Sequence, residues 1–333
     1  MQNSLNTIAD SIRGQSVLVT GASGFVGSAL MRIGLLLNDD FSAGLTLHLG
    51  VREPTEFMKQ LANVRSDIVL TKAVVGEKIA LENPVDMIFH CATPASAELN
   101  VSDPLAMFNL NLASANWIIE DVRLLANCPK VLFTSSGAVY GPQPMNLELI
   151  PETYTGGPDT TSSKSAYAEG KRVAEFLFSE AGRKGLLKPL LGRLFAFSGE
   201  GLPQNRHFAL GNFVRDARSK NVVTVRGSGL DVRSYLDSKD MAIWLFKMAS
   251  LENINTPLNI GSSSAISIAS LAHKVQQRAE IVLNRRVEVE VLGEKNALDG
   301  ANYYVPSTLL TKKTLAVEEW TSIDNSIDQM LCE

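Results

Sequence analysis

Short apolar runs alternate with longer amphipathic stretches over the first two thirds of the chain. Helical spacing of apolar positions predicts helices over Pro104–Ala126 and from the segment around Tyr167 to about Gly182. The apolar runs have the length and composition of buried parallel strands and lie at Ser16–Thr20, Leu45–Gly50, Met87–His90, Val131–Ser135 and Leu190–Phe195. Strands that alternate with helices predict an α/β fold built on a doubly wound parallel sheet.

Beyond about Phe195 the pattern loosens into loops rich in Gly, Pro, Asn and Ser with short helices, as in a substrate-binding lobe. A helix over Asp240–Leu251 and a late strand over Ile254–Ile260 are expected to return to the sheet. We therefore predict a sheet domain over residues 14–195, to which 235–262 return. Residues 196–234 and 263–333 are expected to form a smaller C-terminal lobe.

A glycine-rich segment, Gly21–Gly27, stands between the first predicted strand and a helical run, Ser28–Leu37. Strand, glycine loop and helix in this order form a dinucleotide-binding turn, in which the helix N-terminus offers free N–H groups to the phosphates. Gly21 allows the tight turn, Gly24 lets the backbone approach a pyrophosphate, and Gly27 permits close packing of helix on strand. The predicted cofactor contacts are Gly21, Ser23, Gly24, Phe25, Val26 and Gly27.

Two segments about thirty residues apart carry candidate proton-transfer chemistry: Phe133–Gly141 and Ser165–Lys171. Tyr167 and Lys171 are four positions apart and share one helix face, where the ammonium can lower the pKa of the phenol toward neutrality. Ser136, at a strand end, could supply a third hydrogen-bonding group. This pattern indicates proton transfer beside a carbonyl or carbinol.

These segments together resemble the extended short-chain dehydrogenase/reductase family, the NAD-dependent epimerases and dehydratases, and in particular its members that modify nucleotide sugars. The resemblance extends to Val85–Pro94, similar to the family's fourth strand and the loop over the cofactor, and to Asn111, similar to a helix asparagine behind the active site. Gly211–Phe213 and Gly227–Ala242 are similar to the segment that holds the nucleotide diphosphate.

The resemblance implies a Rossmann sheet and assigns roles to the three residues. Tyr167 would act as general acid/base at the sugar oxygen, Ser136 would hydrogen-bond the same oxygen, and Lys171 would bind the nicotinamide ribose hydroxyls. It also implies a homodimer formed by the helices that start at Pro104 and carry Tyr167, although a face buried within the monomer is the competing interpretation. Cys91, Ala92 and Thr93 are expected at the cofactor.

A nucleotide-diphosphate sugar is the substrate that the resemblance implies. Arg233 is the candidate diphosphate clamp, because a guanidinium can meet phosphate oxygens in a fork; a salt bridge to Asp231 or Asp237 is the structural alternative. Thr93 and Asn212 are further candidate substrate contacts, and His207 a weaker one.

Two features divide the subfamilies. Sugar 4,6-dehydratases place an Asp-Glu pair after the catalytic Ser or Thr, whereas this chain has Gly137 and Ala138, so dehydration is disfavoured. The second predicted strand ends without an acidic residue and Arg52 follows it, which favours NADP(H) over NAD(H), although NAD(H) stays possible and Arg52 could be an ordinary surface charge. Glu77 is a candidate contact on the adenine side.

A dissociable NADPH favours a nucleotide-sugar 4-ketoreductase, an oxidoreductase that acts on a 4-keto-6-deoxyhexose. The segment Arg193–Ser198, followed by Leu202-Pro203 and His207–Phe213, resembles abequose synthases and fucose-forming 4-reductases, and Ala196 replaces the Asn of galactose epimerases. The loop Thr93–Ser96 instead resembles UDP-glucuronate decarboxylases. An NAD-retaining epimerase or decarboxylase therefore stays open, as does a binding protein that has lost catalysis.

Composition removes other classes of function. Of 333 residues 45% are hydrophobic and 20% charged, which is ordinary for a globular protein, and the net charge of −4 with no dense basic patch disfavours nucleic-acid binding. Three cysteines, Cys91, Cys128 and Cys332, lack paired or metal-ligand spacing, so no metal site is predicted and a reducing compartment is favoured. No apolar stretch reaches the length of a membrane span and no signal-peptide pattern is present, so we expect a cytoplasmic protein.

Overall fold

A seven-stranded parallel sheet forms the centre of the computed structural model, which describes residues 1–79, 81, 83–93, 96–204, 208–252, 254–293 and 301–333. The strand order is β11-β6-β5-β4-β1-β2-β3, and every neighbouring pair is parallel. The strands are β1 Ser16–Thr20, β2 Thr46–Val51, β3 Ile68–Lys72, β4 Met87–His90, β5 Lys130–Ser136, β6 Lys188–Leu194 and β11 Leu258–Ile260. This is the predicted doubly wound α/β fold, whose strand order reverses between β1 and β4.

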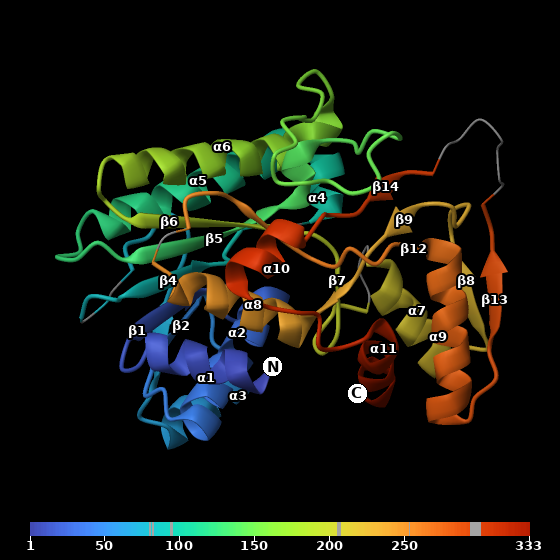
Figure 1. The fold of residues 1–333 in the computed structure, drawn as a ribbon, viewed down its shortest axis with the longest axis horizontal. Coiled ribbons are helices and arrows are strands. Elements are labelled where there is room, and N and C mark those ends of the chain that lie inside the picture. Colours follow the sequence, from blue (N-terminus) through green and yellow to red (C-terminus); the bar gives the residue numbers. More distant parts are fainter. Residues whose placement is uncertain (80, 82, 94–95, 205–207, 253, 294–300) are drawn as a thin grey trace.

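Helices cover both faces of the sheet (Figure 1). Helices α1 Gln2–Ser11, α2 Phe25–Phe41 and α8 Ser238–Ser250 lie on one face, and α5 Pro104–Val122 and α6 Ala166–Arg183 lie on the other. Strand β1 shows how the sequence fills both cores, because successive side chains point to opposite faces. Val17 and Val19 belong to the core under α1, α2 and α8, whereas Leu18 belongs to the core under α5 and α6. A strand buried on both faces must be apolar at nearly every position, as the sequence pattern indicated.

The remaining elements form the smaller lobe beside the carboxyl edge of the sheet (Figure 1). Its core is shared by α7 Ala209–Ser219, α9 Ile268–Leu283 and α11 Ile323–Cys332. Its short strands are β7 Phe197–Ser198, β8 Val222–Val225, β9 Val232–Arg233, β10 Leu236–Asp237, β12 Ile266–Ser267, β13 Glu288–Val291 and β14 Tyr303–Tyr304. The short helices elsewhere are α3 Glu56–Val64, α4 Ala97–Ser102, α10 Leu309–Leu315, η1 Gly137–Tyr140 and η2 Ser163–Ser165.

Most predicted elements are present with ends that shift by a few residues. The helix predicted to reach Ala126 ends at Val122, and the late strand predicted from Ile254 begins only at Leu258. The elements for which the sequence analysis gave no bounds include the N-terminal helix α1 and β3, which lies at the sheet edge and mixes buried with exposed residues. The exact division into domain segments stays a prediction. In the part of the chain that the structure describes, no helix is both long and apolar enough to cross a membrane.

Asp240 ties the C-terminal segment to the sheet domain. Its side chain, in the first turn of α8, is fully buried and accepts hydrogen bonds from the backbone N–H groups of Trp320 at 2.7 Å and Thr321 at 2.8 Å. Burial raises the pKa of Asp240 to about 6, against the opposing effect of these hydrogen bonds.

We predict that this carboxyl makes folding stability depend on pH. The pKa of Asp240 in the folded protein lies above its unfolded value of about 3.9. The protonated carboxyl therefore contributes fully to folding stability below about pH 3.9, and this contribution is lost as the pH rises through about 6. Relative to Asp240→Asn, the wild type should lose about 2–3 kcal/mol of unfolding free energy between about pH 4 and pH 7. Urea unfolding at several pH values measures this difference, and parallel profiles for the two proteins would contradict it.

Candidate active site

Many of the predicted site residues line one cavity at the carboxyl edge of the sheet, where the strand order reverses. A cavity of about 860 Å³ opens there, of the size that small-molecule and cofactor sites have. The sheet domain contributes the glycine turn, the loop after β4 and the ends of β5 and α6. The smaller lobe contributes Asp231, Arg233 and Tyr304.

The glycine turn has the geometry that its sequence predicts. Gly21 has a φ of 68°, which disfavours any residue with a side chain, and a Cβ on Gly27 would lie 2.2 Å from the Gly21 carbonyl oxygen. Gly24 is the N-cap residue of α2, and Phe25 and Val26 line the cavity. Ser23 is exposed and is not among the described lining residues, so its predicted contact with a cofactor stays a prediction.

Ser136, Tyr167 and Lys171 all line this cavity. Ser136 is the last residue of β5, and its Oγ accepts a hydrogen bond from the Ala138 N–H at 3.1 Å. Tyr167 stands in the first turn of α6, where its backbone N–H donates to Asn100 Oδ1 at 2.9 Å, and its phenol hydrogen-bonds with Ser136. The structure therefore brings together the three residues singled out from the sequence.

Lys171 is buried, with 2% of its surface exposed. Its ammonium group contacts a hydroxyl, a carbonyl oxygen and an aromatic ring. Nζ donates to Thr93 Oγ1 at 2.6 Å and to the Thr134 carbonyl at 2.8 Å, and it lies 4.7 Å from the centre of the Phe133 ring. Burial lowers the pKa of Lys171 to about 7. Glu175, one turn further along α6, opposes this change through its negative charge.

The expected effect of Lys171 on Tyr167 is wrong for this structure. The pKa of Tyr167 is raised rather than lowered, because the phenol is buried, and the hydrogen bond with Ser136 compensates only in part. Nζ lies 5.8 Å from the centre of the Tyr167 ring, and its own burial weakens its positive charge near neutral pH. Helical spacing placed the two residues on one face but did not reveal how dry the site is.

Tyr304 is a site residue that the sequence analysis missed. It lines the cavity, hydrogen-bonds with Ser136, and packs against Phe195 with ring centres 4.7 Å apart. Burial raises the pKa of its phenol. Its strand β14 is two residues long and lies far along the chain, so no local pattern marked it. The signal was the Tyr303-Tyr304 pair itself, which places an aromatic and polar side chain in an otherwise loop-like segment.

The predicted cofactor-specificity residue, Arg52, is exposed and directly follows β2, which extends one residue beyond the predicted end. Glu77 is paired with Lys72 at 2.8 Å.

In the loop after β4, Cys91 and Thr93 line the cavity, and burial raises the pKa of the Cys91 thiol to about 12, so it is neutral. Ala92 is not among the described lining residues, yet it lies against Gly21, whose Cβ would be 3.0 Å from the Ala92 nitrogen.

Of the predicted substrate contacts, Arg233 lines the cavity and Asn212 is not among the described lining residues. The Arg233 guanidinium pairs with Asp231 at 3.4 Å, donates to the Asn302 carbonyl at 2.6 Å and lies 5.9 Å from the Tyr304 ring centre. The alternative salt bridge to Asp231 therefore exists, and it holds the guanidinium beside the cavity. Asn212 Oδ1 accepts from Arg215 Nη1 at 3.1 Å, and His207 lies outside the described residues.

Asn111, which the resemblance places behind the active site, bonds the backbone of its own helix, which is the alternative that its sequence also allowed. It is fully buried, and its Nδ2 donates to the Met107 carbonyl at 2.9 Å. A Cβ on Gly170 would lie 2.9 Å from the Asn111 Cβ, so glycine at that position lets α5 and α6 approach closely. In the part of the chain that the structure describes, no group of three or more His, Cys, Asp or Glu is placed to hold a metal ion.

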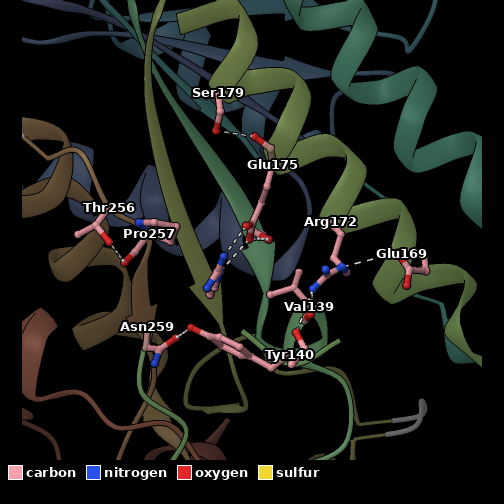
Figure 2. Close-up of polar contacts among 12 residues, drawn as sticks. Val139, Tyr140, Glu169, Arg172, Glu175, Ser179, Thr256, Pro257 and Asn259 are labelled. Atoms are coloured by element: carbon pink, nitrogen blue, oxygen red, sulfur yellow. Dashed lines mark hydrogen bonds and ion pairs between the residues drawn. The ribbon is translucent and has the colours of Figure 1, made fainter. Parts of the chain in front are cut away.

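Glu175 on α6 forms a buried ion pair with Arg193 on β6 (Figure 2). Glu175 accepts from Arg193 Nη2 at 2.7 Å, from Arg193 Nε at 3.0 Å and from Ser135 Oγ at 2.5 Å. Figure 2 shows Glu175 reaching from α6 toward the strands, and Tyr140 pointing at Asn259, to which its hydroxyl donates at 2.8 Å. A buried pair is tolerated when its hydrogen bonds are satisfied. This pair joins α6 to β6, and the bond from Ser135 joins α6 to β5 next to Ser136.

Comparisons with known proteins agree with this geometry. Residues 17–261 match the model of the NAD dependent epimerase/dehydratase family. UDP-glucuronic acid decarboxylase 2 of Arabidopsis thaliana is 27% identical over 323 residues, covering 96% of this chain and 68% of that protein.

Solved structures share the fold. The structure of RMD from Pseudomonas aeruginosa complexed with NADPH aligns with a TM-score of 0.74 at 20% identity, covering 96% of this chain and 98% of that one. UDP-glucuronic acid 4-epimerase from Bacillus cereus, in complex with UDP-glucuronic acid and NAD, aligns with a TM-score of 0.74 at 16% identity, covering 95% and 98%.

The pKa of Lys171 predicts how dinucleotide affinity depends on pH. A ligand that accepts hydrogen bonds from the ammonium favours its protonated form, so the dissociation constant should rise by up to about tenfold per pH unit above about pH 7. Glu175→Gln removes the charge that supports the ammonium, so the rise should begin at a lower pH. Lys171→Met should abolish the part of the pH dependence that comes from the ammonium. Fluorescence titration with NADPH at several pH values measures it.

Glu180→Gln is the matched control, because Glu180 lies on the same helix but pairs with Arg183 at the surface. Its profile should superimpose on that of the wild type, and titration of the cofactor's own phosphate is common to all variants. Identical profiles for wild type and Lys171→Met would contradict the prediction.

Proposed function

Because the chain belongs to the NAD dependent epimerase/dehydratase family, we propose that it transfers a hydride at C4 of a nucleotide-linked hexose. The net reaction that we propose is the NADP(H)-dependent reduction of a nucleotide-linked 4-keto-6-deoxyhexose. The observation that carries this proposal is the convergence of Ser136, Tyr167 and Lys171 in a cavity whose described lining contains one carboxylate, Asp231. Asp231 is paired with Arg233, and we assign the proton transfer to Tyr167, which lies beside Ser136.

Each residue has a task in this reaction. The dinucleotide, when bound, supplies the hydride that adds to the C4 carbonyl carbon. Tyr167 donates its phenolic proton to the carbonyl oxygen as negative charge develops there, and Ser136 hydrogen-bonds the same oxygen and orients it. Lys171 donates to the cofactor ribose and stabilises the phenolate that remains. The raised pKa of Tyr167 keeps the phenol protonated at neutral pH, which suits an acid in the direction of reduction.

The surroundings of Gly137 support a reaction without a second acid. A Cβ at this position would lie 2.6 Å from the Phe195 ring, so no side chain fits there. The Phe195 ring packs there against the Tyr304 ring, with ring centres 4.7 Å apart. An elimination of water from the sugar needs an additional acid/base, whereas the addition of hydride and proton to a ketone does not.

The choice of cofactor rests on the end of β2. In dinucleotide-binding folds an acidic residue there binds the ribose hydroxyls of NAD, whereas an arginine accommodates the 2′-phosphate of NADP. Arg52 is the first residue after β2, and its exposed guanidinium is available to a phosphate. This supports NADP(H).

The three cysteines are free, which suits the reducing conditions of the cytoplasm, where we place the reaction.

UDP-glucuronate decarboxylation is the second candidate. The Arabidopsis thaliana relative that is 27% identical is a UDP-glucuronic acid decarboxylase, and so is another that is 26% identical. The loop Thr93–Ser96 resembles theirs. Pro94 and Ala95 of this loop lie outside the described residues. Once C4 of a uronic acid is oxidised, the carboxylate is β to a ketone and CO₂ can leave without a further acid. Gly137 and Ala138 therefore do not argue against it. Such an enzyme, like an NAD-retaining epimerase, would turn over without added cofactor.

We predict that the purified protein consumes NADPH, and NADH at least about tenfold less efficiently, when mixed with a nucleotide-linked 4-keto-6-deoxyglucose. Tyr167→Phe should reduce kcat at least about 100-fold while the cofactor still binds. Absorbance of the reduced nicotinamide measures turnover, and fluorescence measures binding. Arg52→Ala should raise the KM for NADPH about tenfold or more and leave that for NADH nearly unchanged, because only NADPH has the 2′-phosphate.

The possible outcomes separate the rival functions. Stoichiometric NAD in the purified protein, together with turnover of UDP-glucuronate without added cofactor, would replace the reductase by the decarboxylase. Unchanged function in Tyr167→Phe would instead indicate a dinucleotide-binding protein without catalysis.

We also propose that α5 and α6 pair with the same helices of a second copy. Leu105 and Leu110 on α5 and Phe176 on α6 are exposed, and α5 and α6 lie side by side on the outer face of the sheet (Figure 1). Exposed large apolar side chains on a helix pair are typical of a subunit interface. Light scattering should give the mass of a dimer for the wild type and of a monomer for Phe176→Glu; a monomeric wild type would contradict the proposal.

A further inference from the structure

His90, the last residue of β4, is fully buried and hydrogen-bonded through both ring nitrogens. Nδ1 lies 2.9 Å from Thr20 Oγ1, at the end of β1, and Nε2 lies 3.0 Å from Ser114 Oγ on α5. The sequence analysis placed His90 on a strand but gave it no role. Because each partner is a hydroxyl, which can donate or accept, the direction of the two bonds must be worked out from the other partners.

The Thr20 hydroxyl settles the first bond. Its oxygen accepts a hydrogen bond from the backbone N–H of Ala92 at 3.3 Å, and at 3.2 Å it shares the Cys91 N–H with the Thr20 carbonyl oxygen, which lies at 3.3 Å. With two N–H groups directed at its lone pairs, the Thr20 hydroxyl has its one hydrogen left to donate to the third partner, His90 Nδ1. Nδ1 is therefore unprotonated, and the neutral ring has its hydrogen on Nε2.

The Ser114 hydroxyl settles the second bond in the same sense. It donates to the Ala92 carbonyl at 2.7 Å, which leaves its oxygen to accept the Nε2–H of His90. In the reverse arrangement Thr20 Oγ1 would face three donors, and the Ala92 carbonyl would lose its donor. A doubly protonated ring would meet the same conflict at Thr20. In agreement, burial lowers the pKa of His90 to about 3, and the nearby Lys171 charge adds to this effect.

These bonds form a closed circuit around one loop. It runs from the Cys91 and Ala92 N–H groups to Thr20, then through His90 and Ser114 back to the Ala92 carbonyl. The loop that it holds packs against Gly21 of the glycine turn, and a Cβ built there would lie 3.0 Å from the Ala92 nitrogen, closer than an ordinary van der Waals contact. The circuit therefore fixes the distance between the two loops that border the dinucleotide cleft.

The same circuit extends to the catalytic lysine by two routes. Thr93, next to Ala92, accepts from Lys171 Nζ. Thr134 Oγ1 donates to the His90 carbonyl at 2.9 Å, and the Thr134 carbonyl accepts from Lys171 Nζ. A change in the position of His90 would move both oxygens that hold the ammonium.

We propose that His90, fixed as the neutral Nε2–H tautomer between Thr20 and Ser114, is a positioning residue that holds the Cys91–Thr93 loop as one wall of the dinucleotide cleft. The part of the proposal that concerns cofactor affinity rests on the proposed function, whereas the tautomer does not. His90 acts through the loop and touches no reacting atom, so its loss should weaken cofactor binding more than the chemical step.

Nitrogen NMR of protein labelled in histidine tests the tautomer directly. The chain has four histidines, so the His90 signals are identified by their absence in His90→Gln, or by their burial from solvent exchange if that variant does not fold. We expect an Nδ1 without a hydrogen and an Nε2 that carries one. A protonated Nδ1, or a doubly protonated ring at pH 6, would overturn the proposal whether or not the protein binds a dinucleotide.

Dissociation constants for NADPH and NADH test the positioning role. Thr20→Val and Ser114→Ala should each weaken binding about tenfold, since each leaves a buried group of the circuit unpaired. The double variant should bind only slightly more weakly than either single one, because groups in one circuit are not independent. Thr20→Ser, which keeps the hydroxyl, should restore wild-type affinity, and kcat at saturating cofactor should change by less than about threefold in the single variants.

Thr71→Val is the matched control. Thr71 Oγ1, on β3, also approaches a histidine Nδ1, that of His48 at 3.4 Å, but it is away from the cleft. This variant should lose a similar contact without a change in cofactor affinity. If Thr20→Val and Ser114→Ala bind as Thr71→Val does, or if their effects simply multiply, the circuit does not position the loop. If the wild type binds neither dinucleotide, the proposed function fails, and the NMR result still decides the tautomer.

Discussion

The burial of one cation, the Lys171 ammonium, is the constraint on which the site depends. An ammonium with 2% of its residue exposed is stable only if all its hydrogens have partners. Here the partners come from the loop after β4, from β5 and from the Phe133 ring. Helix α6, the two strands and the loop must therefore hold their relative positions for the lysine to stay where it is, and Tyr167, one turn earlier, is placed by the same requirement.

Two polar networks maintain these positions from opposite sides. Glu175 joins α6 to Arg193 on β6 and to Ser135 at the end of β5, beside Ser136, and its carboxylate supports the lysine charge. His90, with Thr20 and Ser114, holds the loop that accepts from Nζ. Both networks are closed, in the sense that each buried donor named here has an acceptor, and closed networks rigidify a site more than isolated contacts do. The smaller lobe then adds Arg233 and Tyr304, so the cavity is complete only when both parts of the chain are folded.

Much of this arrangement could be predicted from the sequence. Buried parallel strands are marked by short apolar runs, and the glycine turn and the Tyr167-Lys171 spacing have physical reasons that apply wherever they occur. Strand β3 was missed because an edge strand buries only some of its side chains. Tyr304 was missed because it reaches Ser136 through a tertiary contact between segments more than 160 positions apart, which no local periodicity encodes. The raised pKa of Tyr167 was missed because burial depends on the packing of both lobes.

We propose above all that this site delivers a hydride from a dissociable dinucleotide to C4 of a nucleotide-linked sugar. The most direct measurement uses NADPH deuterated at the transferring position of the nicotinamide, with a nucleotide-linked 4-keto-6-deoxyglucose, and locates the deuterium in the product by NMR. We expect one deuterium, at C4 of the sugar. A product formed without deuterium at C4, its hydrogen coming instead from a retained cofactor, would contradict it.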